Sequence, residues 1–300
     1  MIERHYLKQR QSLPLEQKIR LSEMRIRAWH EHWQGMTYVA FSGGKDSTVL
    51  LDVVRSMYPN TPAVFSDTGL EYPEIRDFVK TIDNVVWVKP DMKFPQVVAE
   101  LGYPVATKKV ARQVRILRNP TENNVASRNL YLTGIKRDGT TAMSYKLPKK
   151  WLPLIDAPFD SSEQCCDKIK KQPMYTYGKE TGRVPYLGTM AVESQFRTGL
   201  YLRQGCNAFD AQKPVSAPMA FWLEEDIWEY IRTRNLPYSK IYDMGEKRTG
   251  CMFCMFGVHM EKGENRFQRM KRSHPKQWAY CMDKLGLREV LNFINVETGD

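Results

Sequence analysis

The 300-residue sequence lacks any run of about 18 uncharged apolar residues, which a membrane-spanning helix would need. Its first eight residues also lack the apolar stretch of a signal peptide. Internal repeats and low-complexity segments are absent as well. We therefore expect no membrane association, a cytoplasmic location, and one large domain with or without an appendage.

A glycine loop at residues 42–47 does not match the commonest phosphate-binding motif. A Walker A motif has a glycine five positions before its second glycine and a hydroxyl residue directly after its lysine. Here Val39 and Asp46 occupy those positions. The loop, Ser-Gly-Gly-Lys-Asp-Ser, nevertheless follows a β-branched and aromatic segment and precedes an apolar helical stretch from Thr48 to Val54. Strand, glycine turn and helix start together bind anions, so a different phosphate loop is predicted.

Predicted strands alternate with predicted helices along much of the chain. The strands end near Phe41, Ser66, Val88 and Thr189. This alternation predicts an α/β fold, a parallel twisted sheet with helices on both faces. Ligands of such sheets bind at the carboxyl ends of the strands. We therefore expect the loop at 42–47 and the segment Asp67-Thr68-Gly69 to line one crevice.

The sequence suggests three segments. Residues 1–35 form an N-terminal helical segment, and residues 36–240 form the nucleotide-binding α/β domain. Within that domain, proline and asparagine turn signals predict an irregular insertion near 119–164, a candidate lid. Residues 241–300 contain a Cys-x-x-Cys turn and a helical, cysteine-containing C-terminal part that we expect to pack on the same domain.

Basic residues exceed acidic ones, with a formal net charge of +11. Such a balance suggests polyanionic partners, either nucleotides or nucleic acid. We take the charge to be spread along the chain, with denser places at 108–115 and at 266–272 with Lys276. A solvated helix face explains the second place as well as a binding role does.

The six cysteines include two close pairs, Cys165-Cys166 and Cys251-x-x-Cys254. Four sulfur ligands suit either tetrahedral zinc or an iron–sulfur cluster. Adjacent cysteines chelate a single ion awkwardly, which favours a [4Fe–4S] cluster over zinc; a metal-free dithiol is the remaining alternative. Cys206 could replace one of the tandem pair as a ligand. Cys281 lies in a helical pattern typical of a core residue.

These motifs together resemble a known family. The loop at 42–47, Asp67-Thr68-Gly69-x-Glu71 and Leu187-Gly188-Thr189 are similar to the PP-loop adenine nucleotide α-hydrolases. Within them the chain most resembles the phosphoadenosine phosphosulfate (PAPS) reductase family. The tandem cysteines with the following Lys168, and then Cys251-x-x-Cys254, resemble the cluster motif of adenylyl-sulfate reductases. The resemblance covers roughly residues 36–258.

The resemblance implies a site for each part of the reaction. Asp67 would lie near the nucleotide, with Glu71 as a weaker candidate, and Lys168 would face the phosphosulfate. Cys165, Cys166, Cys251 and Cys254 would hold the cluster. Catalytic roles fall to Lys45, Asp46, Asp67 and Arg197. Nucleotide contacts fall to Ser42, Gly43, Gly44, Lys45, Asp46, Ser47, Asp67, Thr68, Gly188 and Thr189.

Two departures from the family pattern affect the expected activity. Met190 stands where the reductases carry an arginine after Gly-Thr, and Arg197 is the nearest replacement. The last residues, 295–300, contain no cysteine like that of the reductases' mobile tail. We therefore expect an enzyme that binds ATP with magnesium and adenylates an acceptor for sulfur transfer.

The acceptor of that transfer could be a nucleic acid. A sulfur donor or partner protein would be needed, and a homodimer is one open oligomeric state. A sulfonucleotide reductase acting on adenylyl sulfate or PAPS is the alternative activity. A non-catalytic nucleotide-sensing or nucleic-acid-binding protein is the second alternative.

Overall fold

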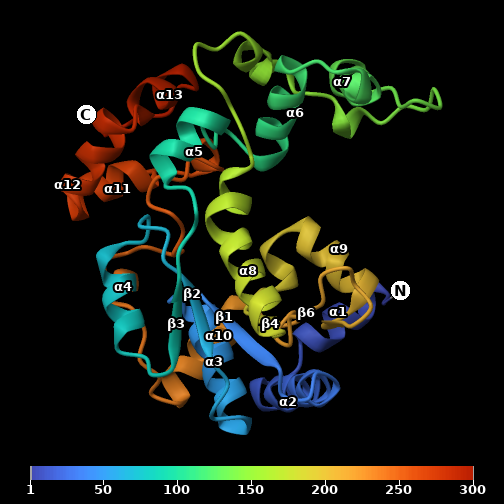
Figure 1. Ribbon diagram of the computed structural model, residues 1–300, viewed down its shortest axis with the longest axis vertical. Coiled ribbons are helices and arrows are strands. Elements are labelled where there is room, and N and C mark those ends of the chain that lie inside the picture. Colours follow the sequence, from blue (N-terminus) through green and yellow to red (C-terminus); the bar gives the residue numbers. More distant parts are fainter. Residues whose placement is uncertain (1, 300) are drawn as a thin grey trace. The chain divides into compact units, whose positions relative to one another are not determined.

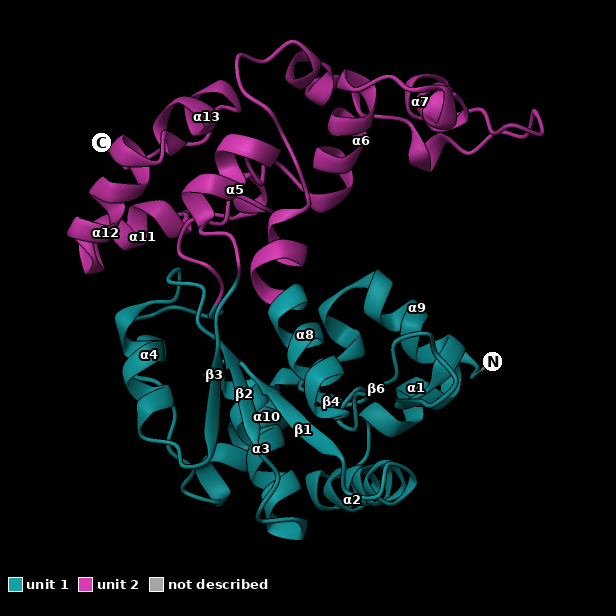
Figure 2. Ribbon diagram, viewed as in Figure 1, with its two compact units in different colours: residues 1–90, 171–249 teal, residues 91–170, 250–300 magenta. Residues whose placement is uncertain are grey.

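A computed structural model describes residues 2–299, which form two compact units, each built from two stretches of the chain (Figure 2). Unit 1 contains residues 1–90 and 171–249, and unit 2 contains residues 91–170 and 250–300. These limits do not follow the predicted segment limits at 36, 240 and 241. In the described part of the chain, no helix combines the length and apolarity needed to cross a membrane.

Unit 1 contains a six-stranded sheet with the order β3-β2-β1-β4-β6-β5 (Figure 1). All neighbouring strands are parallel except β5 and β6, which pair antiparallel. The strands are β1 Thr37–Phe41, β2 Ala63–Ser66, β3 Val85–Val88, β4 Val184–Leu187, β5 Asn207–Ala208 and β6 Val215–Ser216. The predicted α/β class with a mostly parallel sheet is confirmed, and the antiparallel edge pair is an addition to it.

The strand order explains why helices surround the sheet. From β1 the chain moves outward to β2 and β3, then returns to the other side of β1 to form β4. Right-handed crossovers therefore place α3 and α4 on one face and α8 on the other. The helices of unit 1 are α1 Arg4–Gln11, α2 Leu15–His32, α3 Lys45–Met57, α4 Pro73–Lys80, α8 Gln172–Thr181, α9 Gln195–Gln204 and α10 Glu224–Thr233, with 3₁₀ turns η5 Ala191–Glu193 and η6 Lys240–Tyr242.

Unit 2 is helical and packs around buried aromatic and aliphatic side chains that include Phe94, Phe267 and Leu291. Helices α11 and α12 are separate, because α11 ends at Ser273 and Pro275 starts the next helix. The α-helices of unit 2 are α5 Phe94–Leu101, α6 Lys108–Arg118, α7 Val125–Thr133, α11 Arg266–Ser273, α12 Pro275–Ala279 and α13 Leu287–Phe293. Its 3₁₀ turns are η1 Glu122–Asn124, η2 Met143–Tyr145, η3 Lys149–Ile155 and η7 Val258–Met260. The π-helical turns are η8 Tyr280–Lys284 and η4 Asp167–Lys171, whose last residue already belongs to unit 1.

The region predicted as an irregular insertion contains one helix, α7. Thr121 and Asn124 form a capping box just before it, and Gly134 ends it in the left-handed conformation, with φ of 82°. The turn residues that suggested irregular chain are therefore the caps of a helix.

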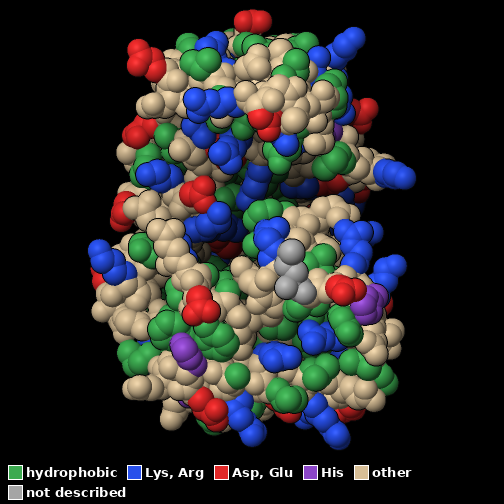
Figure 3. Space-filling view, turned by 90° about the vertical axis from the view of Figure 1, so that its right-hand side faces the viewer, with side chains coloured by type: hydrophobic (Ala, Val, Ile, Leu, Met, Phe, Trp, Pro, Cys, Tyr) green, Lys and Arg blue, Asp and Glu red, His purple; other side chains and the backbone are tan. Residues whose placement is uncertain are grey.

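The face of the molecule in Figure 3 carries Lys and Arg side chains with Asp and Glu among them.

Candidate active site

The glycine loop joins β1 to α3 and is braced by its own serines. The Ser42 backbone N–H donates to Ser47 Oγ at 3.1 Å, and Ser47 Oγ donates to the Gly44 carbonyl at 2.9 Å. Gly43 has a φ of 70°, and a Cβ atom there would lie within 2.9 Å of the Ile75 and Val79 side chains. The loop therefore needs glycine for both its backbone conformation and its packing.

The end of β4 lies directly against this loop. A Cβ atom on Gly188 would approach the Asp46 carbonyl oxygen and Ser47 Cα, each at 3.1 Å. The order of the sheet reverses between β1 and β4, and ligands of open α/β sheets bind at such a switch point. Gly188 thus lets the second wall of the crevice come close to the first.

A cavity of about 500 Å³ opens at this place. Its size is that of a typical small-molecule site. It brings together most of the predicted nucleotide-binding and catalytic residues of unit 1, although Gly43 is not part of its lining. Those that line it are Ser42, Gly44, Lys45, Asp46, Ser47, Gly188, Thr189 and Arg197.

Asp67 and Thr68 do not line this cavity. Both follow β2, which lies on the side of β1 away from β4. Asp67 pairs with Arg76 at 3.1 Å, and the Thr68 hydroxyl donates to Glu71 at 2.6 Å. Glu71 thus braces its own turn. The strand order gives the physical reason for the separation, since the switch point is bounded by β1 and β4.

Lys45 is 5% exposed and sits between two carboxylates in the cavity. Its Nζ atom lies 3.4 Å from Asp46 and 3.3 Å from Glu224. Burial alone would lower the pKa of Lys45, but Asp46, Tyr242 and Glu224 outweigh it and raise that pKa. Lys45 therefore keeps its positive charge at the N-terminus of α3, next to the anion-binding loop.

The pKa of Asp46, by contrast, shifts in the direction that disfavours its charged form. Burial raises the pKa of its carboxyl group, Lys45 lowers it in part, and Glu224 raises it further. Its Oδ1 atom is buried and forms the ion pair with Lys45, but it accepts no hydrogen bond in the described structure. A carboxyl group whose pKa is shifted by burial and by neighbouring charges is typical of a functional site.

Two arginines face the same cavity from different segments. Arg197 comes from α9 and Arg248 from the chain after η6. Burial and then the charge of Arg248 lower the pKa of Arg197, although a guanidinium stays charged at any ordinary pH. Arg197 also pairs with Glu193. Met190, at the position where the family pattern has an arginine, is a buried residue of the cavity wall.

Several lining residues were missed in the sequence, among them Glu224, Tyr242, Arg248 and Thr249. The Tyr242 hydroxyl accepts a hydrogen bond from the Lys45 backbone N–H at 2.8 Å, and its ring lies 5.7 Å from Lys45 Nζ. They lie about 200 residues after the loop in sequence, so no local pattern connects them to it. The basic pair Lys247-Arg248 just before Cys251 is the signal that could have drawn attention to them.

The four cysteines predicted as ligands all belong to unit 2. A hydrogen bond from Cys165 lowers the pKa of Cys166, and the charges of Lys108 and Lys170 lower it further. Cys165 takes the opposite shift, raised by Cys166, by burial and by the charges of Cys254 and Cys251. All four cysteines therefore lie within electrostatic range of one another.

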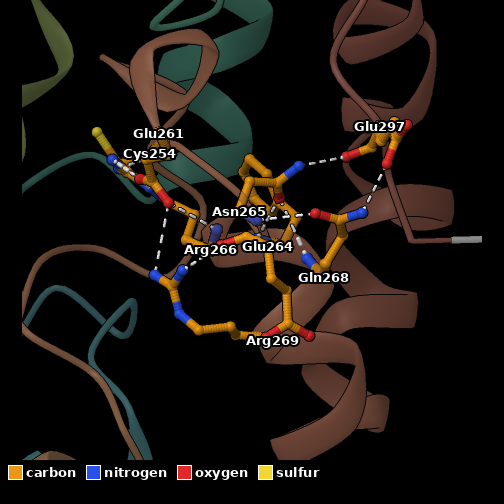
Figure 4. Close-up of polar contacts among 9 residues, drawn as sticks. Cys254, Glu261, Glu264, Asn265, Arg266, Gln268, Arg269 and Glu297 are labelled. Carbon is orange, nitrogen blue, oxygen red and sulfur yellow. Dashed lines mark hydrogen bonds and ion pairs between the residues drawn. The ribbon is translucent and has the colours of Figure 1, made fainter.

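Cys254 is held by a polar network shown in Figure 4. Its carbonyl oxygen accepts a hydrogen bond from Arg266 at 3.0 Å, and Arg266 is fixed in turn by Glu261. Burial raises the pKa of the Cys254 thiol, and Arg266 opposes that shift. The nearby cations Arg266, Lys108 and Lys170 would offset the negative charge of thiolates that ligate a metal cluster.

Among residues 2–299, no group of three or more His, Cys, Asp or Glu side chains is placed to hold a metal ion. The donor chemistry, four cysteines beside cations, still fits an iron–sulfur cluster, whose several irons need ligands around a larger body than one ion. Cys206 lies in unit 1, where its charged neighbours are Arg25 and Arg10, and burial raises its pKa to about 11. Cys281 is fully buried, as predicted for a core residue.

A model of the phosphoadenosine phosphosulfate reductase domain matches residues 36–118 and 83–256. The chain belongs to this family. An adenosine 5'-phosphosulfate reductase of Staphylococcus epidermidis is 24% identical over 80% of this chain and 81% of its own length. The match to the domain spans the glycine loop, the β4 end and both cysteine pairs.

Two uncharacterised proteins of Methanocaldococcus jannaschii, MJ0066 and MJ0973, are 26% and 23% identical over 84% and 88% of this chain. The chain spans only about half of each, 42% and 52%. A PAPS reductase of Candida auris, solved as a phosphate complex, aligns over 80% of this chain and 96% of its own, with 16% identity and a TM-score of 0.44.

Proposed function

We propose that this member of the PAPS reductase family is a sulfonucleotide reductase that acts on adenylyl sulfate. The observation that carries the proposal is the cavity of unit 1, which combines an anion cradle around Lys45 with two guanidinium groups, Arg197 and Arg248. Adenylyl sulfate joins one phosphate to one sulfate, so it offers one anionic group to the cradle and another to the guanidinium groups. The reductases among the curated relatives support this choice.

The reaction requires two electrons. An external dithiol, such as dithiothreitol or a redox partner, would supply them, because four cysteines would hold the cluster and Cys206 and Cys281 are buried. One thiolate would attack the sulfur of adenylyl sulfate, forming an S–S bond and releasing AMP as the phosphate–sulfate bond breaks. A second thiolate would attack that sulfur adduct, releasing sulfite and leaving a disulfide. The overall change converts adenylyl sulfate and two thiols into AMP, sulfite, a disulfide and two protons. The cavity residues would position the nucleotide and stabilise the charge on the departing AMP.

Cys165, Cys166, Cys251 and Cys254 would hold a [4Fe–4S] cluster in unit 2. A bound cluster supplies electrostatic and redox chemistry that side chains lack. The part of this chain in that chemistry is to present four thiolates and the cations that offset them, Lys108, Lys170 and Arg266.

An ATP-using sulfurtransferase is the second candidate, and the observation that favours it is Met190. This side chain is 3% exposed and puts an apolar group on the cavity wall where the family pattern has an arginine. In this reaction an acceptor oxygen would attack the α-phosphate of ATP with magnesium, releasing pyrophosphate. Sulfur from a donor would then displace AMP from the adenylated acceptor.

Product analysis distinguishes the two reactions. Anaerobically purified protein is incubated with adenylyl sulfate and dithiothreitol, and separately with ATP and magnesium. We expect sulfite and AMP in equal amounts from the first mixture and no pyrophosphate from the second. Pyrophosphate from ATP, with no sulfite from adenylyl sulfate, would refute the reductase and support the transferase.

A further inference from the structure

The excess of positive charge is concentrated in one segment, residues 107–150, which we call the basic arm. It contains 11 Lys and Arg residues and only two acidic residues, Glu122 and Asp138. Its net charge is therefore +9, out of +11 for the whole chain. The expectation that the charge is spread along the chain is wrong.

The basic arm lies on the surface of unit 2. Its first helix, α6, buries Val110, Val114 and Leu117 and exposes Lys108, Lys109 and Arg112. The next helix, α7, buries no residue, and it leads into an extended turn (Figure 1). Lys136 and Arg137 belong to this turn and are exposed. The cations of the arm are thus accessible to a ligand.

Few of these cations are neutralised within the protein. Arg115 pairs with Glu163 at 2.8 Å, and Arg118 pairs with Asp160 at 3.5 Å. Within residues 2–299, the structure records no ion pair for the other nine. Eight of these nine are Lys109, Arg112, Arg128, Lys136, Arg137, Lys146, Lys149 and Lys150; the ninth, Lys108, lies close enough to the Cys166 thiol to lower its pKa.

The second basic place in the sequence, on α11, differs in this respect. Arg266 and Arg269 both pair with Glu261, as Figure 4 shows, and Arg272 pairs with Glu264. Its arginines are therefore committed to an internal network. The basic arm, rather than α11, is therefore the basic surface whose cations mostly lack a carboxylate partner within the described residues.

We propose that the basic arm binds the phosphate backbone of a nucleic acid. Unpaired lysines and arginines that neutralise phosphates release condensed counterions, which drives binding without regard to base sequence. Tyr145 is 50% exposed and lies beside Lys109, so a base of a single strand can stack there. The inference holds whichever of the two sulfur reactions the protein carries out.

A nucleic acid fits the arm better than an anionic membrane does. Membrane-surface helices need a long apolar face that sinks into the lipid headgroups. The helix α7 has only nine residues, and the exposed apolar residues of the arm, such as Val125 and Met143, are scattered among polar ones.

The test is fluorescence anisotropy of a 5′-fluorescein-labelled single-stranded 20-mer DNA with the full-length protein. We expect binding at 50 mM KCl that weakens steeply by 200 mM. The variant Lys136→Glu/Arg137→Glu should bind roughly tenfold more weakly at 50 mM KCl and show a shallower salt dependence. The control Lys262→Glu/Lys276→Glu makes the same change in net charge at exposed positions outside the arm. It should bind within about twofold of the unmodified protein.

A second arm variant, Lys146→Glu/Lys149→Glu, guards against a folding defect in the first, and thermal melting confirms that all variants fold. Equal weakening by the control would overturn the inference, because binding would then follow net charge alone. Failure of the unmodified protein to bind the 20-mer would also overturn it. So would binding to phosphatidylserine vesicles in the absence of any binding to DNA.

Discussion

At the scale of single residues, Asp46 shows a conflict between stability and function. Burial raises its folded-state pKa above its unfolded value, so the folded state favours the protonated form. The stability that this group contributes is present below the unfolded pKa and is lost as the pH rises through the folded pKa. At neutral pH the half-buried carboxylate is ionised and therefore contributes less to stability than its protonated form would.

We expect Asp46→Asn to raise the melting temperature at pH 7 and to weaken turnover of adenylyl sulfate. The gain in melting temperature should shrink as the pH falls towards 4, because Asp46 of the unmodified protein then becomes protonated. Differential scanning fluorimetry between pH 4 and 8 measures this. Asp91→Asn, at an exposed position, is the control. A gain for Asp46→Asn that is constant across this range would contradict the account.

Gly188 tests the close approach of the two walls of the cavity. A methyl group there meets backbone atoms of Asp46 and Ser47 at 3.1 Å, so the loop must shift. We expect Gly188→Ala to cost about 1–2 kcal/mol of stability and to weaken nucleotide binding. Gly250→Ala, where a Cβ atom meets nothing within 4 Å, is the matched control. Unchanged binding by Gly188→Ala, measured by calorimetry, would show that the walls do not both contact the nucleotide.

At the scale of elements, a buried ion pair joins α2 to α10. Lys18 Nζ lies 2.6 and 2.8 Å from the Asp226 oxygens, and Asp226 also accepts from the Leu223 backbone N–H at the start of α10. We expect Asp226→Asn to lower the free energy of unfolding by about 3 kcal/mol in urea denaturation, because it leaves Lys18 buried without a counterion. The exposed pair of Asp77 with Lys80 supplies the control, since Asp77→Asn should cost less than about 1 kcal/mol. Equal losses for both variants would rule out this role for the buried pair.

A second prediction at this scale concerns the cysteine-bearing turns of unit 2. We expect anaerobic protein to contain about four irons and four acid-labile sulfides per chain. Cys166→Ser and Cys254→Ser should each lose most of this iron, whereas Cys206→Ser, in unit 1, should keep it. Iron and sulfide assays, with the absorbance near 400 nm, measure the outcome. Stoichiometric zinc, or iron that depends on Cys206, would contradict the assignment.

The sequence predicted the elements of unit 1 well because their signals are local. The glycine loop, the strand before it and the helix after it all carry their own apolar pattern and turn residues. Turn signals before α7 concealed a helix, because capping residues and loop residues are chemically alike. The short pair β5 and β6 has too few residues to show any period.

At the scale of the whole molecule, the order of the strands determines which of the predicted residues line the cavity, and this order could not be predicted from the sequence. All strand ends of a parallel sheet share one edge, which led to the expectation that Asp67 and the glycine loop line one crevice. Only the order β3-β2-β1-β4 shows that the switch point lies beside β4 and that Asp67 lies on the other side. Arg248 and Tyr242 reach the cavity through tertiary contacts between segments about 200 residues apart, which no local pattern records.

The measurement that tests the account most directly is isothermal titration calorimetry of adenylyl sulfate with the unmodified protein and with Lys45→Met. Methionine keeps the length and packing of the buried chain but removes the charge. We expect the unmodified protein to bind one nucleotide and Lys45→Met to bind roughly 10- to 100-fold more weakly, the loss of a charge-assisted contact to phosphate. Equal affinity for both proteins would contradict the claim that the cavity of unit 1 is the nucleotide site.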